Sequence, residues 1–221
     1  MKEIVLNHPM VTHKLSILRD KKTSTKEFRE IVSELAIILC YEATKNIKVH
    51  DVTIKTPLEE YKTSCINEDD FAFVPILRAG MSMVDGILKV MPTAKIGHIG
   101  LYRNEDTLEP VEYYYKMPDN IKNREVFVLD PMLATGGSAI ATIDRLKKDG
   151  VEKINFLCVI AAPEGIEALK KAHKDVKIYC ASVDRCLNEN GYILKNSTTD
   201  KLIGGIYQFK ILKTENSMEE W

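Results

Sequence analysis

The sequence VFVLDPMLATGGSAI, residues 126–140, joins a short apolar run to a glycine pair and then to the start of a helix. An apolar run that ends in a carboxylate and a Gly-Gly turn is typical of a strand in an open α/β sheet. Ligands of such sheets bind beyond the carboxyl ends of the strands. The stretch therefore predicts an α/β fold and a ligand site beside Asp130.

The rest of the chain repeats this alternation on both sides of the quoted stretch. Apolar runs indicate strands at 71–77, 95–101, 125–129, 153–160 and 176–181, and helical patterns cover 81–90, 138–148 and 163–173. An earlier helix begins at a capping box at Ser24, and Pro163 stands at a plausible first helical position. Short apolar strands between helices predict a mostly parallel central sheet that is flanked by helices.

The length and the polar segments indicate how the chain is organised. Its 221 residues fit a single domain, 1–221. One polar insert, residues 102–122, interrupts the alternation and carries Arg103, Pro110 and Pro118. We expect this insert to project as a long hairpin or flap rather than to join the core. It would serve as a surface excursion or dimer arm, as an active-site lid, or as both.

Bulk composition excludes several classes of protein. The formal net charge is −1, so no overall basic field attracts nucleic acid or an anionic membrane. No stretch reaches the roughly 20 apolar residues that a membrane helix needs. The N-terminal sequence has no signal-peptide core, and the five cysteines show no CxxC spacing. We expect a cytoplasmic soluble protein with reduced thiols, bound neither to nucleic acid nor to a membrane.

The glycine turn itself has the features of a phosphate cradle. Gly136 and Gly137 let the backbone approach an anion, and the first free N–H groups of the following helix point at it. Thr135 and Ser138 add hydroxyl donors, and the ionised Asp130 suits a pair of sugar hydroxyls. The sequence has no GxxxxGK[ST] or GxGxxG motif, so neither a triphosphate P-loop nor a dinucleotide fingerprint is indicated.

Residues 129–138 also resemble the loop of uracil phosphoribosyltransferases that binds phosphoribosyl diphosphate (PRPP). Separate matches to the same family occur along most of the chain, at 8–15, 24–30, 41–44, 74–80, 102–110, 161–165 and 191–193. This resemblance implies the type I phosphoribosyltransferase fold, a flap over about 102–122 and a small C-terminal base-binding hood over about 182–212.

The resemblance assigns the PRPP contacts. Asp130 would bind the ribose hydroxyls, Arg78 the diphosphate, and Arg103 would close over the diphosphate from the flap. Asp130 and Arg103 are the catalytic candidates. The full PRPP-binding set is Arg78, Ala79, Gly80, Arg103, Asp130, Pro131, Met132, Leu133, Ala134, Thr135, Gly136, Gly137 and Ser138. A guanidinium at a strand end is suited to this task, because it donates two parallel hydrogen bonds to a phosphate.

The implied reaction transfers 5-phosphoribosyl from PRPP to uracil and yields UMP and diphosphate. Charge builds on the leaving diphosphate, so catalysis depends on positioning and charge stabilisation more than on a protein nucleophile. Mg²⁺ is the expected cofactor. Pro131 follows Asp130 where many related transferases carry a second carboxylate. We therefore expect substrate oxygens and water to hold the metal, with no direct protein ligand.

The base-binding segment departs from the family pattern. Tyr192 and Ile193 match it, but Leu194–Asp200 replaces a glycine-rich segment, and Asp200 is the nearest candidate for its acidic residue. Threonines in this segment restrict backbone conformations that glycine would allow. Three readings follow: a uracil enzyme with a remodelled loop, a phosphoribosyltransferase for a different base, and a non-catalytic relative that binds PRPP or nucleotide as a regulator.

The resemblance also implies an assembly and a regulator. Uracil phosphoribosyltransferases form homodimers or larger homo-oligomers, and some members are activated by GTP through basic residues. We carry both over as expectations for this chain, together with PRPP and uracil as its small-molecule substrates.

Overall fold

The computed structural model describes residues 3–103, 110–189, 191, 193 and 194. Its main sheet has nine strands, and its central order is β1-β11-β10-β8-β4-β6-β7. These strands are β1 (Glu3–Val5), β11 (Lys177–Val183), β10 (Ile154–Ala161), β8 (Glu125–Leu129), β4 (Phe71–Leu77), β6 (His98–Arg103) and β7 (Pro110–Lys116), while β5 (Lys95–Ile96) pairs with β4 and β9 (Met132–Leu133) with β10. Apart from β6–β7, the described pairs of this sheet are parallel.

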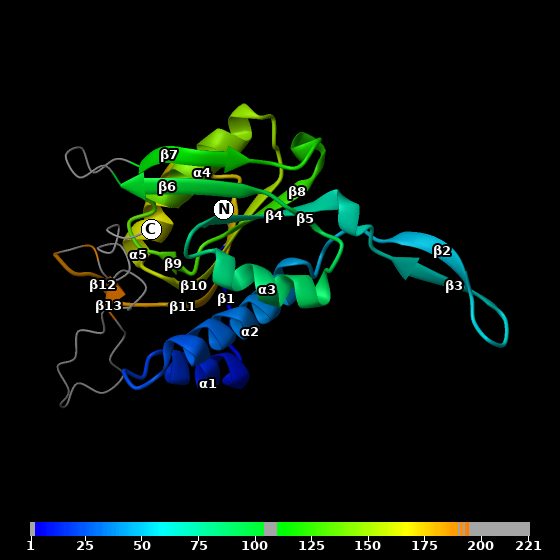
Figure 1. Ribbon diagram of the computed structural model, residues 1–221, viewed down its shortest axis with the longest axis horizontal. Coiled ribbons are helices and arrows are strands. Elements are labelled where there is room, and N and C mark those ends of the chain that lie inside the picture. The colour runs from blue at the N-terminus through cyan, green and yellow to red at the C-terminus, as the bar shows by residue number, and fades with distance from the viewer. Residues whose placement is uncertain (1–2, 104–109, 190, 192, 195–221) are drawn as a thin grey trace, which may run out of the picture.

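Five helices cover the two faces of this sheet in the described chain. They are α1 (Pro9–Leu18), α2 (Thr25–Ala43), α3 (Met81–Val90), α4 (Gly137–Lys148) and α5 (Pro163–Ala172). One core cluster joins α1, α2 and α3 to Phe71 and Phe73 of β4, and the other joins α4 and α5 to Ala72 and Val74 of the same strand. Successive side chains of a strand point to opposite faces, so β4 is apolar throughout because both faces are buried. Figure 1 shows α1, α2 and α3 together beneath the sheet.

The prediction of a mostly parallel sheet flanked by helices is confirmed, and several elements have the predicted bounds. The strands at 71–77 and 125–129 and the helix at 81–90 are β4, β8 and α3. The Ser24 side chain accepts a hydrogen bond from the Glu27 N–H at 3.2 Å, as a helix cap should, and Pro163 is the first residue of α5. Local signals were sufficient here because caps and buried strands depend on neighbouring residues.

Two expectations about strands need correction. The single strand at 95–101 is two short strands, β5 and β6, separated at Gly97, whose N–H donates to the Phe73 carbonyl at 2.9 Å. The insert 102–122 was expected to stay apart from the core, but β7 pairs with β6 at the sheet edge. Its Tyr115 packs partly against the core, and the Tyr115 hydroxyl donates to the Asp149 carboxylate after α4. Residues 104–109 lie outside the described part.

A different hairpin projects from the body of the molecule. β2 (His50–Lys55) and β3 (Glu60–Cys65) pair with each other and extend away from the sheet in Figure 1. The sequence showed only short alternation in this region. The other short elements are the 3₁₀ helices at Glu68–Asp70 and Ile121–Asn123 and the strands β12 (Cys186–Leu187) and β13 (Ile193–Leu194), which pair with each other.

Two further observations concern the whole described chain. No described helix combines the length and the apolar character that a bilayer-spanning segment needs. The five cysteines are all among the described residues, and each is a free thiol.

Candidate functional site

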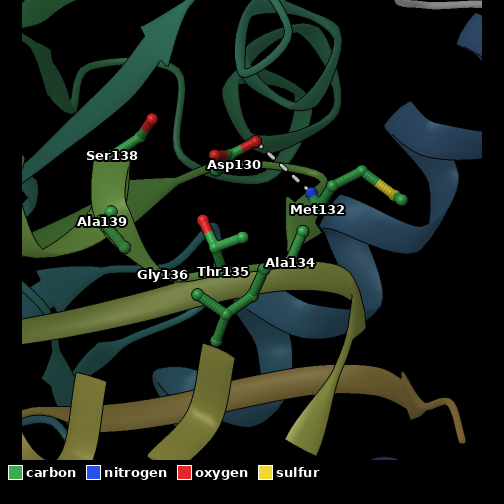
Figure 2. A pocket seen from close by; sticks show the side chains of 9 residues that line it. Asp130, Met132, Ala134, Thr135, Gly136, Ser138 and Ala139 are labelled. Atoms are coloured by element: carbon green, nitrogen blue, oxygen red, sulfur yellow. Dashed lines mark hydrogen bonds between the residues drawn. The ribbon is translucent and has the colours of Figure 1, made fainter. Parts of the chain in front are cut away.

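A small pocket opens where β8 ends, at the carboxyl edge of the parallel sheet. Its volume is about 90 Å³, and it is lined by Asp130, Met132, Leu133, Ala134, Thr135, Gly136, Gly137, Ser138 and Ala139. Pockets that enclose a whole drug-sized ligand measure roughly 300–1,000 Å³, so this one suits a single small group such as a phosphate. Figure 2 shows the carboxylate of Asp130 on one side of the pocket and the hydroxyl groups of Thr135 and Ser138 around it.

The floor of the pocket is held by β10. Asp130 leaves β8, and its carboxylate accepts a hydrogen bond from the Met132 N–H at 3.3 Å. Met132 and Leu133 form the short strand β9 on β10. The Pro131 carbonyl accepts from the N–H groups of Val159 and Ile160, both at 3.0 Å. Pro131 therefore contributes to the rigidity of the loop and does not line the pocket.

The far wall of the pocket is the start of α4. Gly136 precedes this helix with φ of 85°, a left-handed conformation that glycine adopts readily. The first intrahelical bond runs from the Ile140 N–H to the Gly136 carbonyl at 2.9 Å. By helix geometry, the N–H groups of residues 137–139 have no acceptor within the helix and carry the positive end of its dipole. The pocket thus combines free backbone donors with two hydroxyl groups, as an anion site requires.

Two glycines allow the neighbouring segments to support this loop. A Cβ atom at Gly165, in the first turn of α5, would lie 2.4 Å from the Ala134 carbonyl oxygen. A Cβ atom at Gly80, after β4, would lie 2.4 Å from the Leu129 carbonyl oxygen, one residue before Asp130. Any side chain would displace backbone at these contacts. Gly80 therefore supports the predicted site through close packing against β8.

The electrostatic state of Asp130 distinguishes it from a surface carboxylate. Burial at the end of β8 raises the pKa of its carboxyl group to about 7, opposed by the hydrogen bond from the Met132 N–H. The residue as a whole is half-buried. A carboxylate that changes its ionisation near neutral pH in a pocket is a candidate functional group.

Arg78 and Arg103 occupy the ends of neighbouring strands. β4 lies between β8 and β6, so Arg78, directly after β4, is on the same edge of the sheet as Asp130. Its side chain is exposed, and no other residue in the described ranges forms an ion pair with it. Ala79 is half-buried and Gly80 buried. Arg103 is the last residue of β6, which places its backbone at the same edge of the sheet.

The predicted base-binding residues are only partly within the described chain. Ile193 lies in β13 with 8% exposure and packs in the hydrophobic core. A Cβ atom at Gly191 would lie 3.7 Å from Thr135 Cγ2, which brings this segment beside the phosphate pocket. Tyr192, Asp200 and most of the altered loop lie outside the described residues, as does the hood beyond residue 194.

The sequence interpretation missed two contributors to the site. Ala139 lines the pocket as a first-turn residue of α4, one position beyond the predicted set. Gly165 packs directly against the backbone of the phosphate loop. Its segment, 161–165, matched the family in sequence, but no role was assigned to it. A glycine in the first turn of a predicted helix was the available signal, since an interior helical glycine is unfavourable unless close packing requires it.

Comparison with known proteins identifies the family to which these features correspond. The family model for uracil phosphoribosyltransferase matches residues 5–200. The uracil phosphoribosyltransferase of Dictyoglomus turgidum is 54% identical over 203 residues, which cover 91% of this chain and 98% of the relative. That of Clostridium beijerinckii is 51% identical over 205 residues, with 92% and 98% coverage.

Solved structures agree on the fold. A protein of Aquifex aeolicus superposes with a TM-score of 0.83 and 39% identity, covering 87% of this chain and 92% of that protein. The orotate phosphoribosyltransferase of Mycobacterium tuberculosis, solved in complex with PRPP, matches with a TM-score of 0.50 and 12% identity over 80% of this chain and 91% of that enzyme. At this low identity the second likeness shows the fold alone.

Proposed function

The chain belongs to the uracil phosphoribosyltransferase family, and we infer that it transfers 5-phosphoribosyl from PRPP to uracil, giving UMP and diphosphate. The observation that carries this inference is the phosphate pocket with a single carboxylate beside it. Free N–H groups of α4 suit the 5′-phosphate, and Asp130 stands at the pocket edge where the ribose hydroxyls would lie. A pocket of about 90 Å³ accommodates the phosphate and leaves the rest of PRPP at the open sheet edge.

The proposed roles follow from where the charges lie. A ring nitrogen of uracil forms a bond to the anomeric carbon of the ribose, the bond to diphosphate breaks, and the nitrogen loses its proton. Negative charge develops on the leaving diphosphate, and Arg78 at the end of β4 is placed to donate to it. Arg103, which ends β6, would reach the diphosphate from the flap side. Both arginines would stabilise charge that develops on the diphosphate as this bond breaks, and would thereby lower the energy of the transition state relative to bound PRPP.

Mg²⁺ is part of the proposal as a companion of the diphosphate. Mg²⁺ keeps several waters and commonly binds through one or two carboxylates together with substrate phosphates. In residues 3–103, 110–189, 191, 193 and 194, no three His, Cys, Asp or Glu side chains form a metal-binding group. Asp130 is the one carboxylate among the described pocket residues. These residues fit a metal carried by substrate oxygens and water, which would neutralise charge on the leaving group.

Self-association, activation by GTP and a cytoplasmic location are proposed from the family resemblance. Large apolar side chains stand exposed on the described surface, including Leu58 at 95% on the β2–β3 hairpin and Tyr41 at 77% on α2. When exposed apolar side chains form a contiguous patch, the patch is typical of a surface that binds another protein. Sedimentation of the purified chain, with and without GTP, measures the assembly, and initial rates with added GTP measure the activation.

The experiment that tests the function is diphosphate release from PRPP and Mg²⁺ with uracil, cytosine, thymine, xanthine and hypoxanthine in parallel. We expect release with uracil, accompanied by formation of UMP. Release with a different base alone would support phosphoribosyl transfer but would show that uracil is not the acceptor. Binding of PRPP without turnover of any base would contradict the proposed enzymatic activity and favour a non-catalytic protein that binds PRPP.

A further inference from the structure

The root of the base-binding hood, defined as Asp184–Leu187, is the first part of the chain after β11. It contains β12, which pairs with β13, and its Arg185 N–H donates to the Leu194 carbonyl at 2.9 Å. The neighbouring Gly191 approaches Thr135 of the phosphate pocket. Because the root connects β11 to Gly191, the contacts that hold the root also set where this segment lies beside the pocket.

The first contact of the root is a buried ion pair with α1. Arg19, which follows the last residue of α1, donates from Nη2 to both carboxylate oxygens of Asp184, at 2.6 and 2.8 Å. The side chains are only 16% and 6% exposed. Ser182 adds a hydrogen bond from its hydroxyl to Asp184 at 2.8 Å. A buried carboxylate with several donors is fixed in place, since loss of its charged partner would be costly.

The second contact of the root comes from the first turn of α5. Glu164 accepts a hydrogen bond from the Leu187 N–H at 3.0 Å. Its negative charge also lies at the N-terminus of the helix, where the dipole favours it. This bond is exposed to solvent, so it is weaker than the buried pair.

The same turn of α5 also contacts the phosphate pocket. Gly165, next to Glu164, packs against the carbonyl oxygens of Leu133 and Ala134, both of which line the pocket. One rigid helical turn thus touches the phosphate loop through Gly165 and the root of the hood through Glu164. This geometry fixes the separation between the phosphate pocket and the segment that follows the root.

We propose that Arg19 and Glu164 are positioning residues for uracil: they hold the root of the hood at the distance from the phosphate pocket that the bound base requires. Neither residue needs to touch a substrate. The proposal rests on the proposed function, and it names residues outside the sets expected to contact PRPP or uracil. It predicts that loosening either contact weakens use of uracil and leaves PRPP binding intact.

The test compares Glu164→Ala with Glu68→Ala. Glu68 is a matched control, because its carboxylate also accepts from a backbone N–H, that of Thr93 at 2.7 Å, but before β4 at the opposite edge of the sheet. Initial rates give KM for uracil and for PRPP, and calorimetry gives the Kd of PRPP. Loss of one hydrogen bond to a carboxylate should raise the uracil KM of Glu164→Ala by about fivefold. Both PRPP constants and all constants of Glu68→Ala should stay within about twofold.

Arg19→Lys supplies a second variant that keeps the positive charge but cannot reproduce the guanidinium geometry. We expect its uracil KM to rise by about tenfold, again without a change in PRPP affinity. Glu164→Gln retains a side-chain acceptor and should recover most of the uracil KM.

Three outcomes would overturn the proposal. The first is an unchanged uracil KM in both Glu164→Ala and Arg19→Lys. The second is an equal rise of the PRPP and uracil constants, which would indicate general loosening. The third is a parent enzyme that forms no UMP, because this would remove the proposed function on which the inference rests. In the first two outcomes the parent enzyme forms UMP and in the third it does not, so failure of the inference and failure of the proposed function are distinguishable.

Discussion

The two substrate sides of this protein are built in different ways. The phosphate side is one contiguous stretch, Asp130–Ala139, which β10 holds at one end and α4 continues at the other. The described base side begins at Asp184 and depends on Arg19, 165 positions away along the chain, and on Glu164, 23 positions before Leu187. The phosphate side is therefore determined locally and the base side by tertiary contacts.

The difference follows from what each side recognises. A phosphate is an anion of one shape, and helix N–H groups with a glycine turn bind it wherever this geometry recurs. A base is flat, and a site for it must present donors and acceptors at a set distance from the phosphate. Such a distance is a property of packed elements. Four substitutions or conditions test the division between the two sides.

The largest expected effect belongs to Asp130→Asn. Asparagine keeps the acceptor for the Met132 N–H but loses the negative charge, so the fold should persist while turnover falls by about 100-fold or more, as for loss of one transition-state contact. Diphosphate release measures the turnover, and circular dichroism checks the fold. Near-normal activity would contradict the proposed role of Asp130 in binding the ribose hydroxyls of PRPP.

Arg78→Ala should have the next largest effect. Loss of charge-assisted hydrogen bonds to diphosphate should raise the KM for PRPP by about 10- to 100-fold while the uracil KM changes little. Arg29→Ala, at an exposed arginine of α2, is the control. An unchanged response to PRPP concentration would contradict the diphosphate contact, and a rise confined to uracil would assign Arg78 to the base side.

Gly136→Ala tests the glycine turn against a matched position. Gly136 and Gly150 both have φ of 85°, and both substitutions should cost about 1 kcal/mol of stability from backbone strain. The Gly136 position also faces the Gly165 carbonyl at 3.1 Å, so its substitution should move the phosphate loop and raise the PRPP KM by about tenfold. Thermal unfolding and initial rates separate the two effects. Equal PRPP constants for both variants would show that the turn does not position phosphate.

The remaining predictions concern pH. A pKa of about 7 for Asp130 means that the free enzyme loses the carboxylate below neutral pH. We expect kcat/KM for PRPP to fall by about tenfold per pH unit below pH 7 and to level off above it. A pH–rate profile measures this. A profile that is flat from pH 5 to 8 would contradict the ionised role of Asp130.

Stability should respond to the same group in the opposite sense. The folded pKa of Asp130 is raised above the unfolded value of about 3.9, so the folded protein holds its proton more tightly. The resulting contribution is present below pH 4 and is lost as pH rises through 7. Asp130→Asn, which has no proton to lose, should therefore unfold about 2–4 °C higher than the parent at pH 8. The difference should shrink at pH 5, and a lower Tm at pH 8 would contradict it.

Much of the fold was predictable from local sequence. Buried strands such as β4 and β8 appear as apolar runs because both faces are covered, and Ser24 and Pro163 mark helix starts through their own geometry. The sequence predicted a hairpin or flap here, but it did not predict that the β6–β7 hairpin packs on the core, because Tyr115 makes that contact with Arg145 and Asp149 of a distant segment. Its polar composition indicated a projecting flap.

The sequence by itself determined the α/β class, the phosphate loop and the family, because these depend on residues that are neighbours along the chain. Tertiary structure alone decided which distant residues support the loop and the root of the hood: Gly80 and Gly165 by close backbone contact, Arg19 and Glu164 by charge. The physical reason is that close approach and burial arise between elements that are distant along the chain. The sequence of one segment therefore does not indicate which other segment it will pack against.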